Sequence, residues 1–203
     1  MRRDDERTAA RDVSVPMRRK GTRTTPRTKG AEPPGGCTCG RTGFAPARLV
    51  VESPIGPLVL AGDHDALIHV WLPGSAVPIG TDGPLPAPLV AAAHQLDAYF
   101  SGSRRSFSLP LAPRGTDFQL SVWRALGEIG YAETISYAAL ARRVGRPAAS
   151  RAVGQACGAN PLPIVYPCHR VVASDGTLGG YGGGSDMKRQ LLALEGSRGA
   201  TAR

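Results

Sequence analysis

Long apolar segments are missing from this sequence of 203 residues. No stretch approaches the ~20 consecutive apolar residues that a membrane-spanning helix needs, and no apolar region resembles that of a secretory signal peptide. We therefore expect no membrane partner and a location in the reducing cytoplasm. Thiols stay free in that compartment, so an individual cysteine is available as a nucleophile.

Cysteine is scarce, and its spacing argues against a metal site. The four cysteines are Cys37, Cys39, Cys157 and Cys168. The first two form C-x-C without a second pair at zinc-finger spacing, and the four histidines are scattered. Tetrahedral zinc sites usually show paired ligands, so we expect no metal and no cofactor.

Acidic residues are also few, and the positive excess is concentrated at one end. The formal net charge is +9, and residues 1–30, with ten Lys/Arg and four Asp/Glu, contribute +6 of it. Residues 1–44 hold few large apolar side chains and cannot bury enough surface to offset chain entropy, which predicts a disordered basic tail. Such a tail can add sequence-independent attraction to phosphate, but a solvated arm has the same composition.

The segment 45–108 has the pattern of a small domain with an antiparallel sheet and a helix. From residue 48 the sequence RLVVESPIGPLVLAGDHDALIHVWLPG gives apolar runs separated by turn residues, which is typical of antiparallel strands. APLVAAAHQLDAYFSG then places apolar residues at three- and four-residue spacing and ends at Gly102, which predicts a helix. No residue of this segment has an evident chemical role.

A second, mainly helical domain is expected over 117–197, after a proline-bearing linker at 109–116 and before a flexible end at 198–203. DFQLSVWRALGEI predicts its first helix. Ser136 is placed to cap a second helix, and a third begins near Ala148 after the breaker GRP. The fold class is therefore α+β, and the last two helices match a helix-turn-helix, winged-helix-like outline.

The third helix is unusual because almost all its side chains are small. It reads AASRAVGQACG, and Arg151 is its one long charged side chain. A helix that reads the major groove carries several long polar side chains. This one suits close approach in the minor groove, with Arg151 as a probe of the base stack. A tightly packed interior helix with Arg151 in solvent would show the same pattern.

Cys168 and His169 form the most suggestive pair of residues. A free thiol is only a few per cent thiolate at neutral pH, so a nucleophilic cysteine needs a base, and His169 with Glu195 as its orienting acid would complete such a set. Adjacent residues on a strand point to opposite faces, so we expect His169 to reach the sulfur through a bend or a bridging water. A buried structural cysteine beside an unrelated histidine is the plain alternative.

The segment NPLPIVYPCHRVV resembles the active-site signature of the O6-alkylguanine-DNA alkyltransferases, whose usual core is I-P-C-H-R-V. The resemblance spans about 48–196 and includes FQLSVWRAL, ISYAALA, RAVGQACGANP, GYGGG with Lys188, and LLALEG. Tyr166 stands where an aliphatic residue is usual, and Leu194 replaces a residue that is often polar.

The resemblance implies a DNA repair protein that flips O6-alkylguanine out of duplex DNA and transfers the alkyl group irreversibly to Cys168, acting as a monomer in the minor groove. It implies catalytic roles for Cys168 as acceptor, His169 and Glu195 in its deprotonation, Asn160 in organising the turn near the thiol, and Tyr137 at the leaving guanine. DNA-facing and base-facing roles are implied for Arg151, Ala152, Val171, Tyr181 and Gly182.

Two other functions are open from the residues alone. A lesion sensor would use the same fold without transfer, although the presence of Cys168 argues against it. A Cys-His hydrolase would turn over repeatedly, whereas an alkyl acceptor stops after one event.

Overall fold

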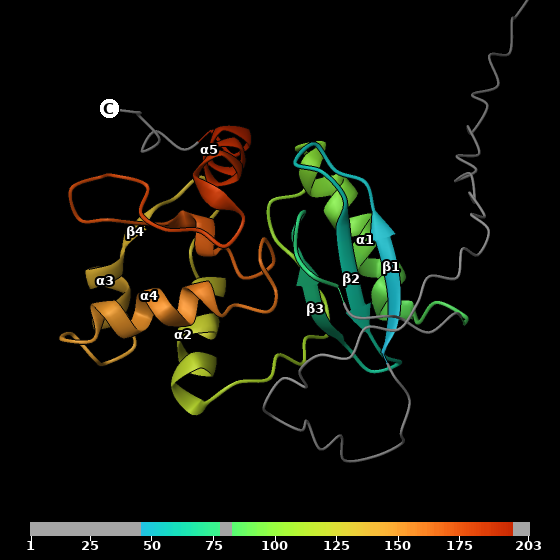
Figure 1. The fold of residues 1–203 in the computed structure, drawn as a ribbon, viewed down its shortest axis with the longest axis horizontal. Coiled ribbons are helices and arrows are strands. Elements are labelled where there is room, and N and C mark those ends of the chain that lie inside the picture. The colour runs from blue at the N-terminus through green and yellow to red at the C-terminus, as the bar shows by residue number, and fades with distance from the viewer. Residues whose placement is uncertain (1–45, 78–82, 197–203) are drawn as a thin grey trace, which may run out of the picture. The chain divides into compact units, whose positions relative to one another are not determined.

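The computed structural model describes residues 46–77 and 83–196 (Figure 1). The predicted basic tail at 1–44, with Cys37 and Cys39, lies outside the described residues, as does the predicted flexible end at 198–203. No helix within the described ranges is both long and apolar enough to cross a membrane.

The first part of the fold is a three-stranded antiparallel sheet covered by one helix. The strands β1 (Ala47–Val51), β2 (Leu58–Gly62) and β3 (Leu67–Trp71) pair in chain order. At the β1–β2 turn Gly56 has φ of 103°, and a Cβ there would meet Pro73 at 2.9 Å, so the turn requires glycine. The predicted strands are confirmed.

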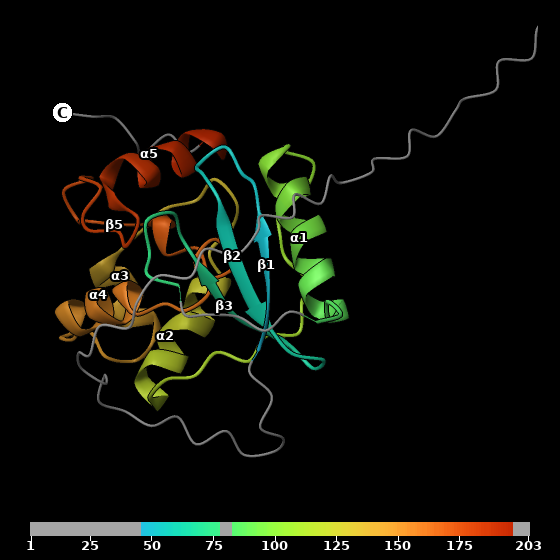
Figure 2. The same cartoon turned by 45° about the vertical axis from the view of Figure 1, so that its right-hand side comes forward.

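Helix α1 (Ala87–Phe100) lies along one face of this sheet and contacts all three strands (Figures 1 and 2). It starts behind Pro86 and ends before Gly102, whose φ of 76° suits glycine. Leu89, Leu96 and Tyr99 are fully buried on its inner face. The predicted sheet-plus-helix architecture is therefore confirmed.

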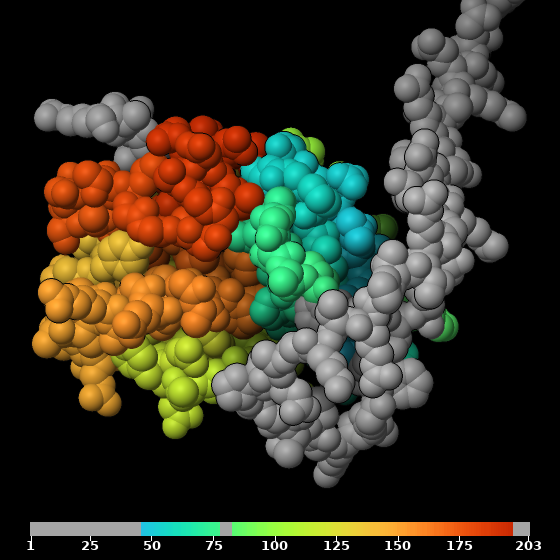
Figure 3. Space-filling view, in the orientation of Figure 1, coloured from blue at the N-terminus to red at the C-terminus, as the bar shows by residue number. Residues whose placement is uncertain are grey.

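The second part is mainly helical, as predicted. Its helices are α2 (Asp117–Gly127), α3 (Tyr137–Arg143), α4 (Ser150–Gly158) and α5 (Gly184–Leu194). Two short strands, β4 (Ile135–Ser136) and β5 (Val171–Val172), pair in parallel. In the space-filling view, the surfaces of α4 and of the residues leading into α5 lie next to each other on one face (Figure 3).

Local sequence signals explain where these helices begin. Thr116 caps α2 in a reciprocal capping box with Gln119, and the Ser136 hydroxyl accepts a hydrogen bond from the Ala139 amide at 3.1 Å to cap α3. The indole of Trp123 on α2 donates to the Ala156 carbonyl at 2.8 Å. This bond fixes α4 against α2, and the tryptophan is buried in the core of the helical part.

The two parts share a packed core. Leu162, Ile164 and Leu191 belong to the same buried cluster as the sheet and α1. The predicted linker at 109–116 runs along the edge of β3, where the Leu67 amide donates to the Pro110 carbonyl and the Ala112 amide donates to the Leu67 carbonyl. Where each predicted domain begins and ends stays a prediction.

Candidate functional site

Asn160 organises the loop that leads to Cys168. Its side-chain oxygen accepts from the Leu162 amide at 3.0 Å, and its amide nitrogen donates to the Tyr166 carbonyl at 2.8 Å and to Cys168 Sγ at 3.3 Å. Ile164, inside the loop, has φ of 74°, an uncommon conformation for a β-branched residue. One amide side chain thus ties both ends of a strained loop to the sulfur.

Cys168 begins a 3₁₀ turn, η1 (Cys168–Arg170), so the strand geometry considered for Cys168 and His169 does not apply. The cysteine is buried, and burial raises the pKa of its thiol. The Asn160 amide, the charge of Lys188 and nearby backbone N–H groups act in the opposite direction on this pKa. These groups therefore offset part of the effect of burial on the thiol.

His169 is fully buried and has one free nitrogen. Its Nε2 lies 2.8 Å from Glu195 Oε1. Because an ionised carboxylate can only accept, Nε2 carries the proton and the neutral ring keeps its lone pair on Nδ1. Nδ1 is buried and has no hydrogen-bond partner among the described residues. Burial lowers the pKa of His169, so the ring is an uncharged base whose accepting nitrogen is unoccupied.

Glu195 is the centre of a dense hydrogen-bond network. Arg170 donates from Nε to Oε2 at 2.9 Å and from Nη2 to Oε1 at 2.8 Å, and its Nη1 donates to the Ile129 carbonyl. Tyr99 donates its hydroxyl to Oε1 at 2.6 Å. Burial alone would raise the pKa of Glu195, but hydrogen bonds from His169, Arg170 and Tyr99 lower it to about 2. The carboxylate is therefore a fixed negative charge.

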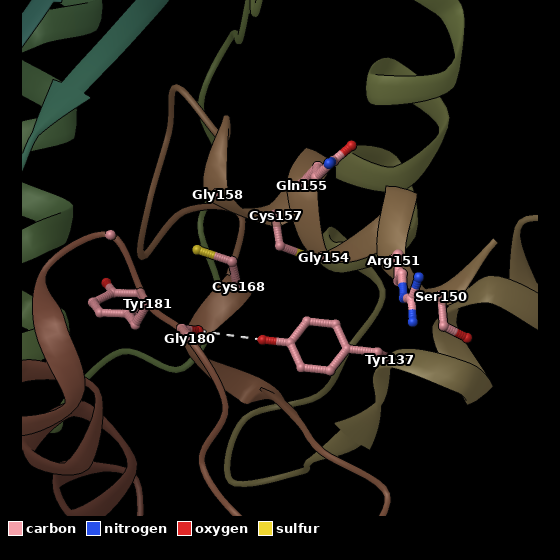
Figure 4. A pocket seen from close by; sticks show the side chains of 11 residues that line it. Tyr137, Ser150, Arg151, Gly154, Gln155, Cys157, Gly158, Cys168, Gly180 and Tyr181 are labelled. Carbon is pink, nitrogen blue, oxygen red and sulfur yellow. Dashed lines mark hydrogen bonds between the residues drawn. The ribbon is translucent and has the colours of Figure 1, made fainter.

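A cavity of about 780 Å³ reaches Cys168 between α4 and the loop before α5. In Figure 4, Tyr181 stands at one end and Arg151 with Ser150 at the other, with Cys168 and Tyr137 between them. Tyr137 donates to the Gly180 carbonyl at 3.2 Å, which joins α3 to the loop across the cavity. The lining residues are Tyr137, Ser150, Arg151, Gly154, Gln155, Cys157, Gly158, Cys168, Gly180, Tyr181 and Gly182.

Lys188 on α5 holds the loop between β5 and α5 in place. Its ammonium donates to the carbonyls of Val171 at 2.5 Å and Leu178, and more weakly to that of Gly180 at 3.4 Å. Burial lowers the pKa of Lys188 to about 8, and the thiols Cys168 and Cys157 act against this shift. The lysine thus combines a structural clamp with a positive charge near the sulfur.

The structure brings most of the expected residues together. Cys168, Tyr137, Arg151, Tyr181 and Gly182 line the cavity. Asn160 donates to the Cys168 thiol, and His169, the next residue in the chain, is hydrogen-bonded to Glu195. Two expected residues do not line it. The Val171 carbonyl accepts from Lys188, and Ala152 lies on α4 outside the lining.

Tyr99 and Arg170 were not expected to belong to this site. Arg170 follows His169 directly in the sequence, and a cationic residue next to the Cys-His pair could have indicated a carboxylate partner such as Glu195. Tyr99 lies 96 positions from Glu195 along the chain, and nothing in the pattern of α1 separates it from an ordinary core residue. Within residues 46–77 and 83–196, no cluster of three or more His, Cys, Asp or Glu could hold a metal ion.

The chain matches two models of one protein family. The domain described as "6-O-methylguanine DNA methyltransferase, ribonuclease-like domain" matches residues 48–113. The domain described as "6-O-methylguanine DNA methyltransferase, DNA binding domain" matches residues 117–197. Together they span both parts of the fold.

Individual relatives agree with this assignment. The methylated-DNA–protein-cysteine methyltransferase of Methanosarcina barkeri is 51% identical over 149 residues, which cover 72% of this chain and 94% of that protein. The crystal structure of Mycobacterium tuberculosis OGT in complex with DNA has a TM-score of 0.68 at 47% identity, and the match covers 73% of this chain and 92% of that one. The crystal structure of the O6-methylguanine methyltransferase of the same organism has a TM-score of 0.67 at 44% identity over 75% of this chain and 94% of that one. The chain belongs to the 6-O-methylguanine DNA methyltransferase family.

Proposed function

We propose that this chain repairs DNA by transferring the alkyl group of O6-alkylguanine irreversibly to Cys168. The observation that carries the proposal is the arrangement around the thiol. Cys168 Sγ accepts a hydrogen bond from Asn160 at the wall of a cavity. The next residue, His169, has a neutral imidazole whose Nδ1 has no hydrogen-bond partner among the residues that the structure describes. Glu195 holds the opposite nitrogen of that ring. This is a nucleophile, a base and an orienting acid.

The transfer is a displacement at the alkyl carbon. The thiol proton passes to His169 Nδ1 through a bridging water, and the sulfur attacks the carbon in line with the guanine oxygen. The S–C bond forms as the C–O bond breaks, and the electron pair leaves with the guanine. Tyr137 keeps its proton because burial raises the pKa of its hydroxyl. Once the hydroxyl leaves the Gly180 carbonyl, it can donate that proton to the departing base.

The thioether that results has no route back to a thiol. A thioether S–C bond is not readily hydrolysed, so each protein molecule acts once. Gly182 supplies a backbone N–H at the exposed rim of the cavity, which faces the guanine oxygen as charge develops on it. Tyr181 forms the wall against which the base lies, and the Val171 carbonyl accepts from the guanine amine beside Lys188.

DNA enters along α4. We assign α3 and α4 to a helix-turn-helix that approaches the minor groove, because the small side chains of α4, including Ala152, permit close contact with the sugar edges. Arg151 is exposed at the start of α4 and lines the cavity, so it can fill the gap that a flipped base leaves. The supporting observation is that α4 carries Arg151 and also forms one wall of the cavity.

The remaining parts have supporting roles in this proposal. Residues 45–108 support the fold of the reactive part at 117–197, and the linker at 109–116 joins the two. The basic tail at 1–44 adds electrostatic attraction to the DNA phosphates. The protein acts as a monomer in the cytoplasm, without a cofactor or a metal.

The test is a stoichiometry measurement. A duplex oligonucleotide with one O6-methylguanine is added in molar excess over the protein, and loss of the lesion is followed to completion. We expect lesion loss to stop at one equivalent per protein molecule. Continued loss beyond one equivalent would favour a hydrolase, and tight lesion binding without loss would favour a sensor.

A further inference from the structure

Tyr99 connects the sheet-and-helix part of the fold to the site. It lies near the end of α1, is fully buried, and packs its ring against Phe100, Phe107 and Tyr131. Packing of this kind needs only an aromatic ring. The hydroxyl, however, donates to Glu195 Oε1 at 2.6 Å, the shortest of the three hydrogen bonds to that oxygen.

Glu195 Oε1 is shared among three donors. Tyr99, His169 and Arg170 all point hydrogens at this one oxygen, at 2.6, 2.8 and 2.8 Å. A carboxylate oxygen has two lone pairs, so three donors compete for its charge. Each donor therefore reduces the negative charge that the oxygen offers to the other two.

We infer that Tyr99 is a positioning residue for alkyl transfer, which fixes Glu195 Oε1 and limits the charge that this oxygen offers to His169. The imidazole then stays neutral, and its Nδ1 remains free to take the thiol proton. The inference rests on the proposed function for its consequence in DNA repair. The hydrogen-bond geometry that carries it does not depend on the substrate.

The charged groups around His169 act on its pKa in opposite directions. Glu195 raises the pKa of His169, while burial, Arg170 and Lys188 lower it. Tyr99 itself faces Glu195, Arg170 and Tyr131, and burial raises its pKa far above the ordinary value. Tyr99 therefore stays protonated, as a donor to Glu195, over the pH range in which a histidine titrates.

The sign of the effect follows directly. Without the Tyr99 hydroxyl, Oε1 presents more negative charge to Nε2 of His169, so the imidazolium is stabilised and the pKa of His169 rises. A larger share of the protein then carries a protonated, inactive base at a given pH. The acid limb of the rate profile moves to higher pH.

The test compares Tyr99→Phe with the matched variant Tyr131→Phe. Both changes remove one hydroxyl and keep the ring, but the Tyr131 hydroxyl donates to the Leu194 carbonyl at 3.3 Å rather than to Glu195. Two rates are measured against pH: alkyl transfer from O6-methylguanine duplex, and modification of Cys168 by iodoacetamide, quantified on its own peptide. We expect Tyr99→Phe to move the acid-limb midpoint upward by about 0.5 to 1 pH unit in both.

Tyr131→Phe should leave both midpoints where they are in the unchanged protein. A uniform loss of rate in Tyr99→Phe with an unmoved midpoint would mean that the hydroxyl only supports packing, and the inference would be wrong. The iodoacetamide profile needs no DNA. If the unchanged protein fails to take methyl from DNA but the iodoacetamide midpoint still shifts, the proposed function fails while the role of Tyr99 stands.

Discussion

Two cysteines on different elements of the helical part line the same cavity, and they differ in their partners rather than in their exposure. Cys157 on α4 is 9% exposed and Cys168 on η1 is 7% exposed. Burial raises the pKa of both thiols, that of Cys157 to about 12. Cys168 has the Asn160 amide and backbone N–H groups to oppose this shift, whereas Cys157 has no hydrogen-bond donor among the described residues. Both thiols are buried, and the hydrogen-bond donors around Cys168 are what distinguishes it from Cys157.

The largest effect is expected for Cys168→Ala. Removal of the acceptor should abolish transfer of the methyl group, while binding to lesion-containing duplex persists because the cavity and α4 remain. Transfer is measured by loss of O6-methylguanine, and binding by a gel-shift titration. Stoichiometric transfer in this variant would mean that another residue, with Cys157 the first suspect, is the acceptor.

A large effect is also expected for Glu195→Gln, which removes the charge behind His169. Loss of the orienting carboxylate should slow transfer by about 10²-fold or more. It leaves Arg170 buried without its partner, so the free energy of unfolding should fall by ~3 kcal/mol. Single-turnover rates are compared after denaturant unfolding has established the folded fraction. A normal rate in folded Glu195→Gln would remove the acid from the proposed set.

The same carboxylate predicts an acid limit to stability. The pKa of Glu195 is held at about 2 in the folded protein, below its ordinary value. Its contribution is therefore complete above the unfolded pKa and is lost as the pH falls through the folded one. The Glu195→Gln variant should show a weaker loss of stability over this acid range than the unchanged protein, as measured by urea unfolding at stepped pH.

An intermediate effect is expected for Arg151→Ala, which changes the end of the cavity away from Tyr181. Transfer from duplex DNA should slow by about tenfold, because the variant cannot fill the gap left by the flipped base. Transfer from the free nucleoside should be nearly unchanged. Arg146→Ala is the matched control, since Arg146 is exposed in the turn before α4 and does not line the cavity. Equal losses on both substrates, or an equal loss in Arg146→Ala, would contradict the base-stack role.

The smallest effect is expected for Cys157→Ala. Within the described ranges this thiol has no hydrogen-bond donor, and burial raises its pKa. Transfer rates should therefore stay within about twofold of the unchanged protein, with ~1 kcal/mol or less of lost stability. The rate is measured on the same methylated duplex. A drop comparable with that of Glu195→Gln would show that the two cysteines act together, and the contrast between them would fail.

Local sequence signals predicted much of the fold. The turn residues of the first strands, the Ser136 cap and the stop at Gly102 all act over a few residues, and the structure confirms each of them. The family resemblance is also confirmed. Turns and helix caps can be predicted from the sequence because the residues that form them are neighbours in the chain.

Contacts between distant segments were not predictable in the same way. Tyr99 meets Glu195 only because the chain folds back between them, and the apolar pattern of α1 explains Tyr99 fully as a core residue. The resemblance implied that Asn160 organises the turn near the thiol, but no propensity favours the positive φ of Ile164 in the same loop. The roles assigned to individual site residues stay predictions until the variants are measured.

The most direct test of the central claim is peptide mapping by mass spectrometry after reaction with an O6-methylguanine duplex. The account predicts one methyl group per protein, carried by the peptide that contains Cys168, with the Cys157 peptide unmodified. A methyl group on Cys157, or complete loss of the lesion with no methylated peptide, would contradict it.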